Sequence, residues 1–179
     1  SASLTFLSLL LPAALCSSLH AQGARPGPAS DVREFGVPGK ASRARVWSER
    51  GADGREHAFT SVSLDGVRFG PARETRYELE LRYRRFDPLS GAVEIPSALR
   101  ARPENRLFVV QYWTQGLEDY RDVLRELGGE VLLFLAHNAN VIELEPSRLA
   151  RVRALPFVRA VPPFHPAYPL EEVLLAALR

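Results

Sequence analysis

Residues 106–113 read RLFVVQYW, a continuous apolar run rich in β-branched and aromatic side chains. Such a run is typical of a central strand that is covered on both faces. The apolar residues that follow recur at intervals of three or four, on one side of a predicted helix: Leu117, Tyr120, Leu124 and Leu127. We expect Thr114 to cap this helix and Gly128 and Gly129 to end it.

Toward the C-terminus the sequence predicts two more strands, a second helix and a last strand. Residues 130–136 and 141–145 are apolar segments that we expect to pair antiparallel around a short turn. Pro146 suits the first turn of a helix, and residues 157–161 predict the last strand. The order β-α-β-β-α-β over residues 106–163 is the ferredoxin-like arrangement, so we expect an α+β fold.

One face of this predicted sheet is left without helices. Phe108, Val110 and Tyr112 are expected to face the two helices, because side chains alternate along a strand. The opposite face then carries five side chains from the first and third strands: Val109, Gln111, Trp113, Val141 and Glu143. Two interpretations stay open: either this partly apolar face binds a partner, or strands within residues 57–105 cover it.

The region before residue 106 divides in two. Residues 57–105 show strand-like alternation, with a turn expected at Asp65-Gly66, and predict a small β-rich extension that packs on a neighbour. Residues 22–56 are rich in Gly, Pro, Ala, Ser and Arg and show no period. That composition predicts a flexible linker.

Composition excludes several kinds of function. The chain has 179 residues and a formal net charge of +2, which is too small to indicate a nucleic-acid partner. Its single cysteine cannot form an internal disulfide, and no Cys/His spacing resembles a zinc site. We therefore expect no metal and no cofactor.

The first residues resemble an export signal. Residues 4–15, LTFLSLLLPAAL, are apolar and uncharged, but a bilayer-spanning helix needs about 20 residues. We expect residues 1–21 to be a signal peptide without its basic start, and the mature chain to be secreted, extracellular or periplasmic, with no stable membrane anchor. A buried helix and a lipid anchor on Cys16 are the alternatives.

Residues 107–170 resemble the N-terminal prodomain of secreted bacterial subtilisin-like serine proteases. The resemblance covers about 65 of the 179 residues and depends on the order and spacing of short pieces. These pieces are Val109-Val110-Gln111, Leu127-Gly128-Gly129-Glu130-Val131, the turn Asn138–Val141, Leu155-Pro156-Phe157-Val158-Arg159 and His165-Pro166-Ala167-Tyr168. It implies a ferredoxin-like propeptide domain that acts as intramolecular chaperone and inhibitor of the catalytic domain of the same precursor.

The resemblance also implies two contact regions. The open face with Val109, Gln111, Trp113, Val141 and Glu143 would dock on two surface helices of the protease, where Glu143 or Glu145 would cap a helix N-terminus. The tail would enter the active-site cleft, with these residues: Phe164, His165, Pro166, Ala167, Tyr168, Pro169 and Leu170. Residues 164–179 would thus be an extended tail followed by the start of a truncated helix.

The catalytic part of such a protease is not expected here. A subtilisin-like enzyme needs a serine nucleophile, a histidine base and an aspartate, and the local motifs of that family do not occur in this sequence. We therefore expect a precursor fragment without hydrolytic activity. Two other functions stay open: a stand-alone secreted serine-protease inhibitor, and a ferredoxin-like interaction module.

Overall fold

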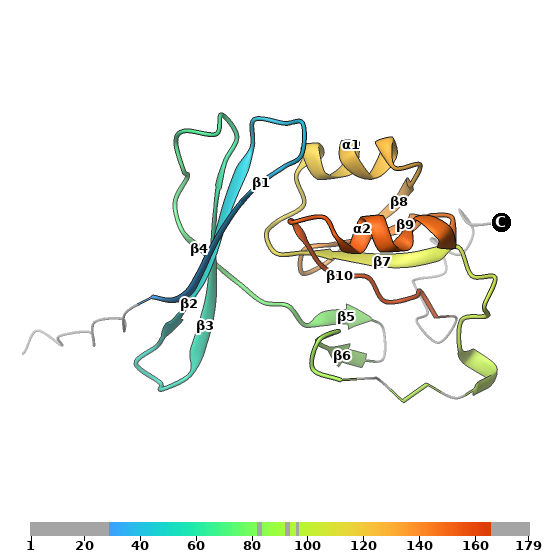
Figure 1. Cartoon of the computed structure of the whole chain (residues 1–179). Coiled ribbons are helices and arrows are strands. Elements are labelled where there is room, and N and C mark those ends of the chain that lie inside the picture. The colour runs from blue at the N-terminus through green and yellow to red at the C-terminus, as the bar shows by residue number, and fades with distance from the viewer. Residues whose placement is uncertain (1–28, 82–83, 92–93, 96, 166–179) are drawn as a thin grey trace, which may run out of the picture.

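The computed structural model describes residues 29–81, 84–91, 94–95 and 97–165. Over these residues the chain is an α+β protein with two four-stranded sheets and a separate two-stranded sheet. Figure 1 shows the first sheet beside the second, and the two-stranded sheet on the side of the second sheet that faces away from the helices.

The first sheet consists of β1 (Ser30–Gly36), β2 (Arg43–Arg50), β3 (Glu56–Ser63) and β4 (Arg73–Thr75), paired antiparallel in that order. The expectation of a flexible linker over 22–56 is therefore wrong for β1 and β2. In β2, Ala44 and Val46 are buried and alternate with exposed Arg43 and Arg45. This alternation is typical of a half-buried strand. It is hard to recognise in the sequence because the segment is rich in arginine and small residues, a composition that also indicates a linker.

The segment 57–105, which we expected to be rich in strands, contains most of β3 together with β4, β5 (Leu79–Leu81) and β6 (Arg84–Phe86). It does not form a separate unit, because β3 pairs with β2 along its whole length, from Arg43–Ser63 to Arg50–Glu56. A 3₁₀ helix (Ser97–Leu99) follows the β5–β6 pair. The Asp65 carboxylate accepts hydrogen bonds from the amides of Val67 and Arg68, which stabilises the expected turn.

The second sheet consists of β7 (Leu107–Tyr112), β8 (Glu130–Leu135), β9 (Ala139–Glu143) and β10 (Val158–Ala160). Its strand order is β10-β7-β9-β8 and every pair is antiparallel. The helix α1 (Glu118–Glu126) connects β7 to β8, and a 3₁₀ turn (Pro146–Arg148) leads into α2 (Leu149–Arg153) between β9 and β10. The order of elements predicted from the sequence is therefore present.

The ends of α1 differ in how well the sequence anticipates them. The N-cap is Leu117, not Thr114, and no side chain caps it. Thr114 is buried instead and shares a hydrogen bond of 2.9 Å with the Tyr120 hydroxyl. At the other end Gly128 adopts a φ of 79°, and the Gly128 and Gly129 amides donate to the carbonyls of Arg125 and Leu124, respectively. This Schellman motif ends the helix where expected.

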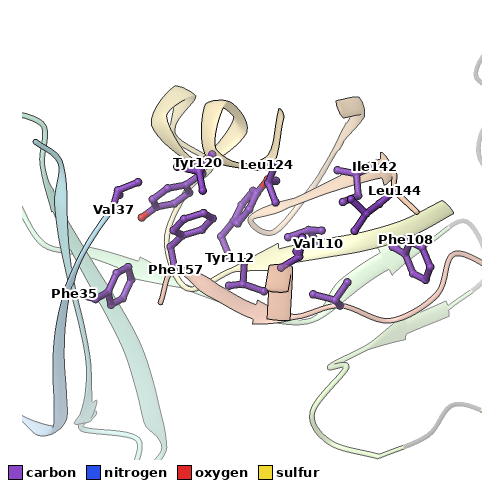
Figure 2. Close-up of a cluster of buried hydrophobic side chains, with 14 of the residues drawn as sticks. Phe35, Val37, Phe108, Val110, Tyr112, Tyr120, Leu124, Ile142, Leu144 and Phe157 are labelled. Atoms are coloured by element: carbon purple, nitrogen blue, oxygen red, sulfur yellow. The ribbon is translucent and has the colours of Figure 1, made fainter. Parts of the chain in front are cut away.

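The main core lies between the helices and the second sheet. Phe108, Val110 and Tyr112 face this core, as the alternation along β7 predicts. Tyr120 and Phe157 stack at its centre, with ring centroids 4.3 Å apart. The first sheet shares this core through Phe35, Val37, Ala44 and Val46. Figure 2 shows Phe35 and Val37 reaching toward Phe157 and Tyr120.

Candidate docking face

Three of the five residues of the expected docking face are inaccessible in the folded chain. Val109, Gln111 and Val141 each have 0% of their surface exposed. The expectation that this face is open is therefore wrong, and the alternative, that the chain's own strand-rich segment covers it, describes the fold. The cover consists of the described residues among 77–95 (77–81, 84–91 and 94–95), called the covering segment below, which includes β5 and β6.

The covering segment and the sheet face form a second small core. Leu79 and Ile95 from the covering segment are 1% and 6% exposed, and they cluster with Val109 and Val141. The remaining members of this cluster are Leu135, Ala139 and Phe164, with Phe86, Leu107, Leu132 and Leu133 packed at its margin. The alternation that places apolar residues on this face is thus explained by burial within the chain.

A buried arginine joins the covering segment to the sheet. The Arg159 side chain on β10 is 6% exposed, and its two terminal nitrogens donate to the Asp87 carboxylate at 2.6 and 2.7 Å. Burial raises the pKa of Asp87, but the hydrogen bonds from Arg159 and from the Leu89 amide outweigh this effect, so the pKa lies below its ordinary value of 3.8. Asp87 therefore remains ionised at neutral pH and keeps the bidentate pair.

Gln111 completes this polar network inside the apolar face. Its side-chain oxygen accepts from Arg159 at 2.7 Å, and its nitrogen donates to the Tyr77 carbonyl at 2.7 Å. Both ends of the amide are used, which compensates for the cost of burying it. Gln111 thus binds the covering segment, rather than presenting a polar group to a partner.

Trp113 lies where several aromatic and cationic groups meet. The Tyr77 ring contacts it edge-on at 5.7 Å between centroids, and the guanidinium groups of Arg33 and Arg159 lie 5.3 and 5.4 Å from its ring. The Tyr77 hydroxyl donates to the Trp113 carbonyl, and burial raises the pKa of Tyr77 to about 12. Trp113 is only partly buried, and no described residue forms a hydrogen bond with its indole nitrogen.

Glu143 and Glu145 lie at the end of β9, and both pair with the same arginine. The Arg106 guanidinium lies 3.2 Å from the Glu143 carboxylate and 2.9 Å from that of Glu145. All three side chains are at least 39% exposed, so these are surface ion pairs of small energetic weight. In the folded chain both carboxylates are engaged by Arg106 instead of pointing freely from the face.

The first two residues of the expected tail belong to the fold. Phe164 is 7% exposed, and its amide donates to the Leu107 carbonyl at 2.8 Å. The His165 ring accepts a hydrogen bond from the Ala101 amide at 2.8 Å, while burial and Arg100 lower its pKa below 6.5. Phe164 and His165 therefore do not form a free arm. The other expected tail residues lie outside the described residues: Pro166, Ala167, Tyr168, Pro169 and Leu170.

The sequence reasoning missed the residues that fasten the covering segment. The sequence patterns assign no role to Asp87, and Arg159 enters the sequence analysis only within the segment Leu155-Pro156-Phe157-Val158-Arg159. An arginine between Val158 and Ala160 is the available signal, because a buried cation needs an acidic partner. That signal does not identify Asp87, which lies 72 residues earlier in the chain.

Away from this face, His57 lies between two carboxylates. Its ring nitrogens lie 2.9 Å from the Glu74 carboxylate and 3.1 Å from that of Asp53. These contacts raise the pKa of His57. Because both nitrogens are occupied by carboxylates, the cluster fastens the turn after β2 to β4 and resembles no nucleophile–base pair.

Comparison of the chain with models of protein families, with curated proteins and with solved structures finds no match. Within residues 29–165, as far as they are described, no cluster of His, Cys, Asp and Glu has the arrangement of a metal site. None of the helices in that same part of the chain is long and apolar enough to cross a membrane.

Proposed function

We propose that residues 106–165 form a ferredoxin-like propeptide-type domain of a secreted subtilisin-like serine endopeptidase precursor. In this role it inhibits the catalytic domain of the same precursor, its partner in cis, and assists the folding of that domain. Its location is extracellular or periplasmic. No nucleic acid, membrane anchor or cofactor takes part.

One observation carries this proposal. The sheet order β10-β7-β9-β8, with both helices on one face, leaves a second face whose centre is apolar. That face is covered by a short segment containing two three-residue strands instead of by a layer of helices. A two-stranded sheet of this size is marginally stable by itself, so the covering segment depends on the contacts it makes with the sheet.

Docking of a protease on this face requires the covering segment to leave it. Its departure costs the stabilising free energy of two sets of contacts: the apolar contacts of Leu79 and Ile95, and the Arg159–Asp87 ion pair. A tethered catalytic domain has an effective concentration that reaches the millimolar range, which favours such an exchange. After cleavage the tether is lost, and the covering segment competes better for the sheet. The proposed inhibitor would therefore release its protease more readily once it is cut free.

Inhibition of a bacterial subtilisin by the full chain tests the proposal. We expect the full chain to slow hydrolysis of a fluorogenic peptide, and Asp87→Asn to inhibit several-fold better, because the substitution weakens the fastening of the covering segment. Glu104→Gln, an exposed acidic residue in no described ion pair, is the matched control and should inhibit like the unmodified chain.

The inhibition measurements distinguish an absent inhibitory role from a protease contact at another site. Absence of inhibition by all three proteins at about 100 µM, a concentration at which even weak complexes form, would contradict an inhibitory role. Equal inhibition by the unmodified chain and Asp87→Asn would keep the role but place the contact away from the covered face. Thermal unfolding of each variant shows whether it is folded.

An interaction module is the second candidate function. The covered second face favours it, because the central strands β7 and β9 are almost fully buried on both faces without any partner. In that case the chain folds and remains monomeric by itself, and neither the unmodified chain nor Asp87→Asn affects a subtilisin.

A further inference from the structure

Two neighbouring open cavities lie near the C-terminal end of the second sheet's edge, and the first of them runs along the edge strand β10. The first, of about 420 Å³, is bounded by β10, Pro88 and Leu89. The second, of about 400 Å³, is bounded by the chain around residues 101–105 and by Phe108. Arg153 and Pro163 line both cavities, so the two meet at these residues. Together they are called the edge groove below.

The walls of the edge groove are rigid and mostly apolar. Five of the lining residues are prolines: Pro88, Pro103, Pro146, Pro162 and Pro163. Proline has a fixed φ and no amide hydrogen, so such walls lose little entropy when a ligand binds. Leu89 is 56% exposed at the margin and offers apolar surface to a ligand.

The charge of the edge groove has one sign. Among the described residues, its charged lining consists of three arginines: Arg102, Arg153 and Arg159. Arg159 is neutralised by Asp87. Arg102 and Arg153 are exposed and pair with no carboxylate in the described part of the chain, and Arg153 makes only a long hydrogen bond of 3.3 Å to the Val161 carbonyl. Most of the five donors of its guanidinium remain available to an anion.

The edge groove also has an unpaired strand edge. β10 is the outermost strand on its side of the second sheet, and no described strand pairs with its outer edge. An exposed strand edge pairs readily with an extended peptide, whose backbone provides matching donors and acceptors. The bulge between Val158 and Ala160 and the prolines after β10 limit this pairing to a few residues.

We propose that the edge groove binds an extended peptide segment of a partner protein in which an Asp or Glu is flanked by apolar residues. The carboxylate pairs with the Arg153 guanidinium, which matches its planar shape. The neighbouring apolar side chains pack on Leu89 and on the prolines after β10. This binding uses the edge of the sheet and not its covered face. Because Pro88 and Leu89 belong to the covering segment, the edge groove is complete only while that segment covers the sheet, so peptide binding excludes the proposed docking of a protease but does not require it.

Fluorescence anisotropy with a labelled peptide tests the binding. The probe is fluorescein-labelled Ala-Val-Glu-Val-Glu-Val-Ala, and the matched peptide carries Gln in place of Glu. We expect saturable binding of the acidic probe to the full chain with a Kd below about 1 mM. The glutamine peptide and the Arg153→Gln variant should each weaken binding about tenfold, the effect of losing one charge-assisted pair.

Two further variants refine the test. Arg151→Gln removes an exposed arginine from the same helix that does not line the groove, and it should leave the affinity unchanged. Leu89→Asp places a negative charge at the margin and should weaken binding while leaving the fold intact, because Leu89 is exposed. Thermal unfolding of each variant confirms that it is folded.

Several results would overturn the proposal. One is equal affinity of the acidic and glutamine peptides, and another is unchanged binding by Arg153→Gln. Competition by free glutarate as strong as that by unlabelled peptide would reassign the groove to small carboxylates. Tighter probe binding after Glu171→Gln and Glu172→Gln would instead identify the chain's own acidic residues as the occupant.

Discussion

At the scale of single residues, His57 makes the stability of the first sheet depend on pH. Its pKa is raised above 6.5, first by the hydrogen bond to Glu74 and then by the one to Asp53. A raised pKa in the folded state means that the protonated ring contributes its full stabilisation below pH 6.5 and loses it as pH rises through the higher value. His57 therefore strengthens the contact between the turn after β2 and β4 in mildly acidic solution.

An NMR titration checks this effect. The pKa of His57 should lie above 6.5 in the unmodified chain and move toward 6.5 in Glu74→Gln, because the largest cause of the shift is removed. The free energy of unfolding should decrease from pH 6.5 upward more steeply in the unmodified chain than in His57→Gln. A His57 pKa that is the same with and without Glu74 would contradict the contact.

Gly128, which ends α1, adopts a backbone conformation that favours glycine. Its φ of 79° is in the left-handed region, and an added Cβ would collide with the Arg148 guanidinium, which donates to the Leu127 carbonyl at 2.7 Å. Gly128→Ala should lower the free energy of unfolding by about 1–2 kcal/mol, from backbone strain together with displacement of Arg148.

The matched control is Gly54→Ala, which has a similar φ of 76° but nothing within 4 Å of the added Cβ. It should cost less than Gly128→Ala, and the difference measures the Arg148 contact. Urea unfolding monitored by circular dichroism gives both values. Equal losses in the two variants would show that Arg148 adjusts without cost.

At the scale of elements, the stacked rings of Tyr120 and Phe157 join α1 to the chain just before β10. The rings are nearly parallel, with 2° between their planes, and both residues are 0% exposed. Phe157→Ala should destabilise the protein by about 3–5 kcal/mol, because it removes a large buried ring and leaves a cavity. Phe134→Ala, at a site that is 67% exposed on β8, should change stability by no more than about 0.5 kcal/mol.

Urea unfolding of the two phenylalanine variants measures these losses. A small loss for Phe157→Ala would mean that the surrounding side chains close the cavity. A large decrease in the free energy of unfolding for Phe134→Ala would mean that this exposed ring contacts a second molecule.

The sequence predicted some elements better than others, for physical reasons. α1 and the four strands of the second sheet carry strong local patterns, such as the Leu117–Leu127 stripe and the Gly128-Gly129 stop. β1 and β2 do not, because only a few of their side chains enter the core, and the exposed positions carry mostly polar and charged residues, with arginines in β2. An alternating pattern also cannot tell whether a face is covered by a partner or by the same chain. The long-range pair of Arg159 with Asp87 determines that, and no local pattern encodes it.

At the scale of the whole molecule, the two four-stranded sheets should unfold together. Phe35, Val37, Ala44 and Val46 of the first sheet belong to the same core cluster as Tyr120 and Phe157. The surface contacts of the β1–β2 turn with α1, such as Lys40 with Asp122 at 3.3 Å, add little by comparison. A continuous core makes opening of one sheet expose the other, which favours a single cooperative transition.

The two tryptophans report on this cooperativity, because Trp47 lies in the first sheet, stacked on Phe59, and Trp113 follows β7 in the second. Trp47→Phe and Trp113→Phe each leave one fluorescent probe. In urea, each fluorescence midpoint should agree with the circular dichroism midpoint of the same variant. Clearly separate midpoints would show that the sheets unfold independently.

The covering segment precedes in the chain every strand of the sheet that it covers. During translation the N-terminal side emerges from the ribosome first. Leu79 and Asp87 are therefore outside the exit tunnel before Val141 and Arg159 have been synthesised. The apolar second face of the nascent sheet can therefore be covered by this earlier segment as soon as its strands pair. Holdase chaperones and neighbouring polypeptides then have little opportunity to bind it.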